Sequence, residues 1–119
     1  MDFRWTTLSV KDYQKSLEFY RDIVQLPVKR EFTMGENMRF AFLGDKETQI
    51  ELIYNPKEEK VFGDAVSIGF RVDSLDQMIE FLKEKNIEIV GEVVQPSDDI
   101  KFIYVLDPNG LKVQFSESL

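Results

Sequence analysis

The same order of predicted elements occurs twice in this sequence, and this repetition restricts the folds that the chain can adopt. In each half, one strand is followed by a helix and then by three more strands. Hydrophobic residues recur at a constant interval of 62 positions, in the pairs Leu8 and Phe70, Val10 and Val72, Phe19 and Phe81, and Phe40 and Phe102. Because element order, turn position and spacing agree, we predict an α+β protein built from two tandem βαβββ modules.

The first module is predicted to span about residues 1–56. Alternating hydrophobicity predicts a strand over 5–10 with one buried face. Asp12 is the expected N-cap of the next helix, in which Tyr13 and Leu17 recur at helical spacing. The remaining strands of this module are predicted over 28–32, 38–43 and 48–54.

The second module is predicted to span about residues 64–119. It begins with a strand over 66–72, and residues 73–74 open its helix. Its remaining strands are predicted over 87–94, 101–106 and 111–115. The sequence Asp-Pro-Asn-Gly at 107–110 predicts a turn before the last strand, because Pro presets φ and Gly supplies a positive φ.

The whole chain, residues 1–119, is predicted to be a single domain. Its mass of 14.0 kDa suits one domain, and a hydrophobic fraction of 43% with ten Phe is enough for a core. The polar stretch at 55–63 is predicted to be a solvated linker between the modules.

Charge and the lack of targeting signals restrict location and partners. A net charge of −7 argues against binding to nucleic acid or to an anionic membrane surface. No apolar run approaches the roughly 20 residues of a membrane span, and the first residues lack the apolar stretch of a signal peptide. With no Cys there is no disulfide framework, so we expect a cytoplasmic protein.

The absence of histidine restricts the chemistry further. The sequence contains neither His nor Cys, the residues that supply most transition-metal sites and most activated nucleophiles. Zinc sites of nitrogen and sulfur ligands and Ser-His or Cys-His pairs are therefore excluded. Acid–base chemistry would have to use Asp, Glu, Lys or Tyr.

Several short segments occur in an order and at a spacing that match a known family. Residues 5–12 and 16–20 resemble its opening strand and helix, and 49–52 resemble the strand that closes its first module. Residues 67–72 resemble the opening of its second module, and 106–115 resemble its final turn and strand. On these segments, which cover essentially the whole chain, the sequence resembles the vicinal oxygen chelate superfamily of glyoxalase I, bleomycin-resistance proteins and extradiol dioxygenases.

The resemblance implies an architecture and an assembly. In this superfamily each module curls its sheet into a half-barrel, and paired modules surround a cleft. Two-module chains in this superfamily often pair with a second copy, so we expect a homodimer. Open half-barrels would otherwise leave apolar walls exposed.

The resemblance also implies where metal ligands would lie. Carried over by position, the four ligand sites correspond to Trp5, Glu51, Ser67 and Gln114. Alternation along the strands predicts that all four project away from the helices into one cleft. Indole is a donor only, serine is a poor ligand and glutamine offers a neutral carbonyl. We therefore expect no metal and no other cofactor.

The candidate site residues each allow two interpretations. Trp5 is either a flat wall for an aromatic ligand or a side chain that fills the volume of a lost metal. Glu51 is either a catalytic base or a leftover carboxylate hydrogen-bonded to Ser67, Gln114 or water. Arg71, like Arg39, is either a clamp for an anionic substrate or a surface ion-pair partner.

These residues allow two functional hypotheses, one of a binding protein and one of an enzyme. The first is a metal-free binding protein, similar to the bleomycin-resistance branch, whose partner is a small apolar or aromatic molecule held near Trp5, Ser67, Gln114 and Arg71. The second is a lyase or isomerase related to glyoxalase I, with Glu51 as its base or with a weakly bound divalent metal. The lack of His favours the first hypothesis, whereas the acidic residue at a ligand position keeps the second open.

Overall fold

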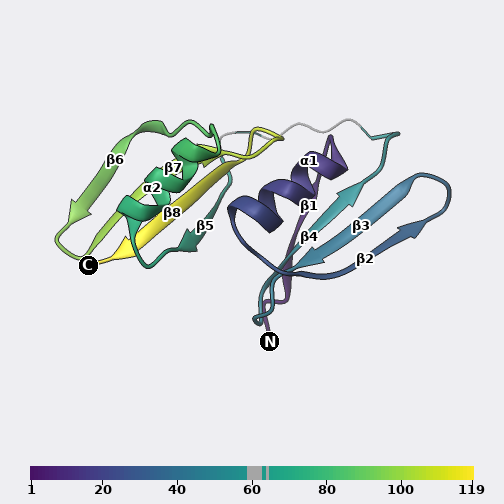
Figure 1. Ribbon diagram of the computed structural model, residues 1–119. Coiled ribbons are helices and arrows are strands. Elements are labelled where there is room, and N and C mark those ends of the chain that lie inside the picture. Colours follow the sequence, from purple (N-terminus) through teal and green to yellow (C-terminus); the bar gives the residue numbers. More distant parts are fainter. Residues whose placement is uncertain (59–62, 64) are drawn as a thin grey trace. The chain divides into compact units, whose positions relative to one another are not determined.

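The computed structural model describes residues 1–58, 63 and 65–119 (Figure 1). The chain divides into two compact units, Met1–Val61 and Phe62–Leu119, here called unit one and unit two. Part of the predicted linker, residues 59–62, lies outside the described residues.

Unit one is a four-stranded mixed sheet with a helical segment across one face (Figure 1). Its elements are β1 (Trp5–Ser9), α1 (Tyr13–Glu18), η1 (Phe19–Ile23), β2 (Val28–Met34), β3 (Met38–Leu43) and β4 (Gln49–Tyr54). The sheet order is β1-β4-β3-β2; β1 runs parallel to β4, and the other neighbours are antiparallel. The helix between β1 and the other strands lets the first strand pair in parallel with the last.

Unit two repeats this topology. Its elements are β5 (Ser67–Arg71), α2 (Leu75–Glu84), β6 (Val90–Ser97), β7 (Ile100–Leu106) and β8 (Lys112–Ser118). The sheet order is β5-β8-β7-β6, with β5 parallel to β8 and the other pairs antiparallel. The predicted α+β class and the duplicated βαβββ order are thus confirmed.

Both helices begin at side-chain caps. The Asp12 carboxylate accepts a hydrogen bond from the backbone N–H of Lys15 at 3.0 Å, which confirms the predicted N-cap. The Ser74 hydroxyl accepts the equivalent bond from Gln77 at 3.2 Å. Each cap satisfies a backbone donor that the first helical turn leaves without an intrahelical partner.

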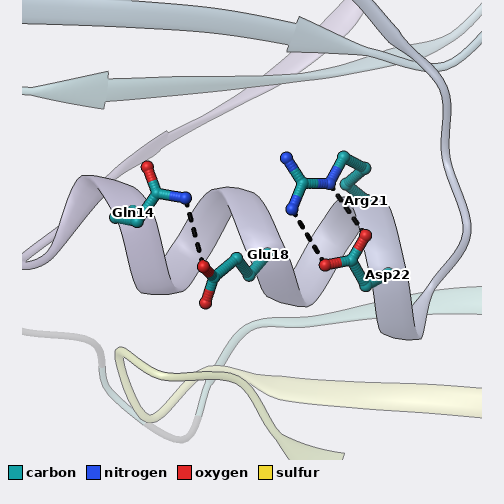
Figure 2. A network of polar contacts seen from close by, with 4 residues as sticks. All are labelled: Gln14, Glu18, Arg21 and Asp22. Atoms are coloured by element: carbon teal, nitrogen blue, oxygen red, sulfur yellow. Dashed lines mark hydrogen bonds and ion pairs between the residues drawn. The ribbon is translucent and has the colours of Figure 1, made fainter.

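The first helix widens into a π-helical turn, η1, where a continuous α-helix was expected. Val24 donates its backbone N–H to the carbonyl of Phe19 at 3.1 Å, and Gln25 takes a left-handed conformation with φ of 66°. The exposed side of this segment carries polar pairs, shown in Figure 2 as Gln14 with Glu18 and Arg21 with Asp22. Exposed pairs of this kind contribute little to stability, so the buried side holds the helix in place.

The core of each unit lies between its helix and the facing side of its sheet. In unit one, α1 packs against β4. The buried strand residues on this side are Leu8, Ala41, Leu43, Ile50 and Leu52. In unit two, α2 packs against β8. The buried residues there include Leu75, Leu82, Ile103, Val105, Val113 and Phe115. Burial of such side chains contributes about 1.5–3 kcal/mol each.

The predicted strand at 87–94 is wrong in position, because β6 begins at Val90 and continues through Pro96 to Ser97. Every residue of β6 is exposed, and its pairing with β7 is irregular, with Gly91 at a φ of 76°. A proline is tolerated at such an edge, where the strand has a neighbour on one side only. Alternating burial is the signal used to locate strands, and β6 lacks it.

The predicted turn at 107–110 is confirmed. The buried Asp107 carboxylate accepts hydrogen bonds from the backbone N–H groups of Asn109 at 2.8 Å and Leu111 at 2.9 Å, and Gly110 has a φ of 88°. None of the described helices is long and apolar enough to span a bilayer.

Candidate functional site

The face of the unit one sheet that points away from α1 is rich in aromatic side chains. Strand alternation brings the following side chains to this side: Trp5, Thr7, Arg30, Phe32, Phe40, Phe42 and Glu51. We call this set the aromatic face. It contains two of the predicted site residues, Trp5 and Glu51, and brings them to neighbouring strands.

The rings of the aromatic face contact one another in a continuous series. Trp5 meets Phe42 edge to face, with ring centroids 5.7 Å apart. Phe32 stacks on Phe40 at 4.8 Å with nearly parallel planes, and lies 6.4 Å from Phe42. Phe40 and Phe42 are buried, whereas Trp5 is 48% exposed and Phe32 is 36% exposed. The outer two rings thus offer accessible aromatic surface above a packed inner pair.

Arg30 lies on the same rings. Its guanidinium carbon is 4.6 Å from the centroid of Phe42 and 5.3 Å from that of Phe32. These distances fall within the range of cation–π attraction, so the two rings hold the guanidinium against the face.

A single row across the sheet joins the charged groups of the aromatic face. Thr7 pairs with Glu51, Glu51 with Phe42, and Phe42 with Arg30. The Thr7 hydroxyl donates to the Glu51 carboxylate at 2.6 Å. A carboxylate and a guanidinium therefore lie two strands apart, about 10 Å at ordinary strand spacing, with the Phe42 ring between them.

A pocket lies at one end of β2 and β3, where the turn between them meets the segment after β4. Met34 on β2 pairs there with Met38 on β3. Met34 follows Phe32 by two residues, and Met38 precedes Phe40 by two residues, so both methionines share the parity of these rings. The pocket has a volume of about 550 Å³. Its lining comes from the β2–β3 turn and from the segment after β4: Met34, Gly35, Glu36, Asn37, Met38, Asn55, Pro56 and Lys57. This volume lies within the range of small-molecule sites, and flexible methionines adapt to irregular ligands.

Unit two carries the other three predicted site residues on the corresponding face. Ser67 and Arg71 alternate along β5 on the same side as Gly69, whose register partner is Gln114. Ser67 and Arg71 are exposed. The Gln114 amide nitrogen donates to the Tyr104 hydroxyl at 3.2 Å. A Cβ at Gly69 would come within 3.1 Å of the Gln114 amide oxygen, so glycine leaves room for this side chain.

Arg39 occupies the opposite side of the unit one sheet from Trp5. Its guanidinium carbon lies 4.0 Å from the ring centroid of Tyr13, a residue of α1. Arg39 therefore does not share the face that carries Trp5 and Glu51. The side chain packs against the helix because position 39 has the strand parity of the buried residue Ala41.

The residues at the implied metal positions do not fit a transition metal. Trp5 presents a donor only, and Ser67 and Gln114 offer neutral oxygens; Glu51 supplies one carboxylate, which already accepts from Thr7. Within residues 1–58, 63 and 65–119, no three acidic side chains gather closely enough to hold an ion. This donor set lacks both the charge and the ligand types that such a metal requires.

Four residues of the aromatic face were not predicted from the sequence as site residues: Thr7, Arg30, Phe32 and Phe42. Their shared face follows from register, because Arg30 and Phe32 alternate on β2 and face Phe42 and Phe40 on β3. The segment 28–34 contains four charged or polar residues among its seven, so it shows no buried face, and alternation alone did not indicate its importance.

Comparisons with known proteins agree in their result. The profile described as the Glyoxalase/Bleomycin resistance protein/Dioxygenase superfamily matches residues 3–115. The uncharacterized protein YraH of Bacillus subtilis strain 168 is 30% identical over 92 residues, which cover 68% of this chain and 70% of YraH. The metallothiol transferase FosB of Staphylococcus epidermidis is 27% identical over 108 residues, covering 89% of this chain and 74% of FosB.

A solved structure extends the similarity to the fold. The trypanothione-dependent glyoxalase I of Leishmania major superposes with a TM-score of 0.80 at 22% sequence identity. The superposition covers 97% of this chain and 85% of that protein. At this identity the match shows a shared fold.

Proposed function

Since the chain belongs to the glyoxalase/bleomycin resistance protein/dioxygenase superfamily, we propose that it binds a small planar aromatic molecule, without a metal, on its aromatic face. The observation that carries this proposal is the exposure of Trp5 and Phe32 above the buried pair Phe40 and Phe42. A planar ligand would cover the two accessible rings and remove their apolar surface from water.

The neighbouring pocket supports the same proposal. It begins at Met34 and Met38, which continue the series of side chains on β2 and β3. An apolar extension of the ligand would enter this space of about 550 Å³. The face and the pocket together suit a molecule with an aromatic part and an apolar substituent.

The donor set supports metal independence. Two similar proteins carry names that imply catalysis, a metallothiol transferase and a glyoxalase I. In this chain Trp5 stands at one of the implied metal-ligand positions, and its indole offers only an N–H donor. Glu51 stands at another and is hydrogen-bonded to Thr7. A lyase or isomerase that uses Glu51 as its base is the competing hypothesis, and turnover of the methylglyoxal–glutathione adduct tests it directly.

One spectroscopic experiment tests binding. The chain contains a single Trp, so a ¹⁵N–¹H correlation spectrum contains one indole signal, and it reports on the aromatic face. We expect neutral planar probes such as 2-naphthamide to shift this signal saturably. Cyclohexanecarboxamide is a control that lacks a π system. An indole signal that no planar probe moves at millimolar concentration would contradict the proposal.

A further inference from the structure

We infer that Arg30 makes the aromatic face selective for anions, and that its preferred ligands are planar aromatic carboxylates or similar aromatic anions. This inference rests on the proposed function and adds the chemical class of the ligand. It is carried by the position of the guanidinium, which lies against the same rings that a planar ligand would contact.

The cation–π contacts leave hydrogen-bond donors of Arg30 available for a ligand. A guanidinium has five N–H donors in one plane, more than contact with two rings can occupy. Contact with Phe32 and Phe42 therefore holds the group against the face and leaves donors for a ligand. The two oxygens of a carboxylate can accept from two of these donors side by side. A neutral amide has one acceptor oxygen and cannot form this paired contact.

No protein carboxylate competes for these donors in the described part of the chain. Arg21, Lys83 and Lys101 each lie within 4.0 Å of an acidic oxygen. For Arg30, no Asp or Glu of residues 1–58 and 65–119 lies within this distance. In a chain with net charge −7, an arginine without such a partner on an aromatic face is a local site of positive charge.

Glu51 sets the orientation of the ligand. It lies two strands from Arg30 in the same row, with the Phe42 ring between the two charges. An anionic group beside Glu51 would be repelled, whereas the same group beside Arg30 is attracted. A planar anion would therefore place its charged end toward β2 and its ring toward Trp5.

The test compares two probes of nearly equal shape, 2-naphthoate and its neutral analogue 2-naphthamide, by titration of the Trp5 indole signal. We expect the parent protein to bind the carboxylate about fivefold to tenfold more tightly at low salt. This ratio should shrink in about 0.5 M NaCl because salt screens exposed charges. Arg30→Gln should bring the ratio close to one.

Lys29→Gln is the matched control, because it removes the same charge from the adjacent position of β2. It should keep the preference for the carboxylate, and Arg30→Lys should keep only part of it, since an ammonium is not a planar fork. A preference that survives in Arg30→Gln would overturn the inference. If Arg30→Gln does not fold, Arg30→Met takes its place, because it keeps an apolar stem and removes the charge, and a preference for the carboxylate that survives in Arg30→Met would overturn the inference.

The outcome also separates the two proposals. If both probes shift the Trp5 signal with equal affinity in the parent protein, the proposal of aromatic binding is supported and the inferred selectivity for anions is wrong. If neither probe shifts the signal, the proposed function falls, and the inference about Arg30 falls with it.

Discussion

The indole ring of Trp5 meets the ring of Phe42 edge to face, with centroids 5.7 Å apart and planes inclined by 81°. Trp5 is 48% exposed, so one side of the indole packs and another is accessible. We expect Trp5→Ala to weaken the binding of planar aromatics by up to about tenfold, because stacking contributes about 0.5–1.5 kcal/mol beyond area burial. Calorimetric titration of the variant measures this loss.

The stability of the same variant shows whether Trp5 forms a ligand-binding surface or fills volume in the core. Since half of the side chain is already exposed, Trp5→Ala should lower the free energy of unfolding by about 1 kcal/mol. Trp5→Phe is the control and should keep most of the binding and the stability. A loss of about 3–5 kcal/mol in chemical denaturation, with no ligand response in the parent, would show instead that Trp5 fills a cavity.

The second prediction concerns Glu51 and its hydrogen bond of 2.6 Å from the Thr7 hydroxyl. We expect Glu51→Gln to keep the fold, to change stability by less than about 0.5 kcal/mol and to leave binding of neutral aromatics intact. An amide oxygen still accepts from Thr7, and the half-buried carboxylate no longer has to be desolvated. Thermal melts of the two proteins measure the difference.

Two results would contradict this view of Glu51. Turnover of the methylglyoxal–glutathione adduct by the parent protein, abolished in Glu51→Gln, would identify a catalytic base. Destabilisation by about 3 kcal/mol or more would indicate a buried charge network that the described hydrogen bonds do not explain. Thr7→Val serves as the matched control, since it removes the donor and keeps the acid.

Much of the fold was predictable because its signals are local. The caps at Asp12 and Ser74 and the turn at Asp107 use side chains that bond to backbone groups within four residues. Strand β6 was misplaced because all its residues are exposed and its pairing with β7 is irregular. At such an edge, partner geometry and not hydrophobic alternation decides where the strand begins.

The candidate site was only partly predictable, since it depends on register between strands distant in sequence. Parity alone placed Trp5 and Glu51 away from the helix, but it gave no reason to connect either of them with Arg30. Only the pairing of Arg30 with Phe42, and of Phe42 with Glu51, puts these groups in one row. A shift of one residue in either pairing would send Arg30 to the opposite face.

The third prediction is that the purified protein retains no stoichiometric transition metal. Trp5, Ser67 and Gln114 supply no anionic or imidazole ligand, so Glu51 is the one strong donor of the four positions. After exposure to zinc, nickel or manganese and extensive dialysis, elemental analysis should find well below one ion per chain. About one retained ion per chain would contradict the prediction, and its loss in Glu51→Gln would identify the ligand.

The fourth prediction is that two copies of the chain associate. Strand β6 lies at a sheet edge and exposes Val90, Val93 and Val94, with fractional exposures of 41–49%. Association would cover apolar surface of this kind. Light scattering at tens of micromolar should therefore give the mass of a homodimer. Val94→Lys should weaken association and Lys29→Gln should not; a monomeric parent protein would contradict the prediction.

The last prediction concerns alkaline pH and the buried ring of Tyr13. Burial, followed by the hydrogen bond of 2.7 Å to Glu31, raises the pKa of the Tyr13 hydroxyl well above its ordinary value. Because the folded pKa exceeds the unfolded one, the protonated hydroxyl stabilises the fold fully below about pH 10, and this contribution is lost as pH rises further. In ultraviolet titration, Tyr13 should therefore ionise only as the protein unfolds.

Tyr13→Phe tests this contribution. At neutral pH the variant should lose about 1–2 kcal/mol, because the hydroxyl also donates to the Phe40 carbonyl at 3.2 Å. Above about pH 10 its stability should fall less steeply than that of the parent, because this hydroxyl can no longer ionise. Denaturation at a series of pH values gives both curves, and Tyr54→Phe controls for the removal of a tyrosine on its own. Parallel curves for the Tyr13→Phe variant and the parent above pH 10 would show that Tyr13 does not carry this dependence.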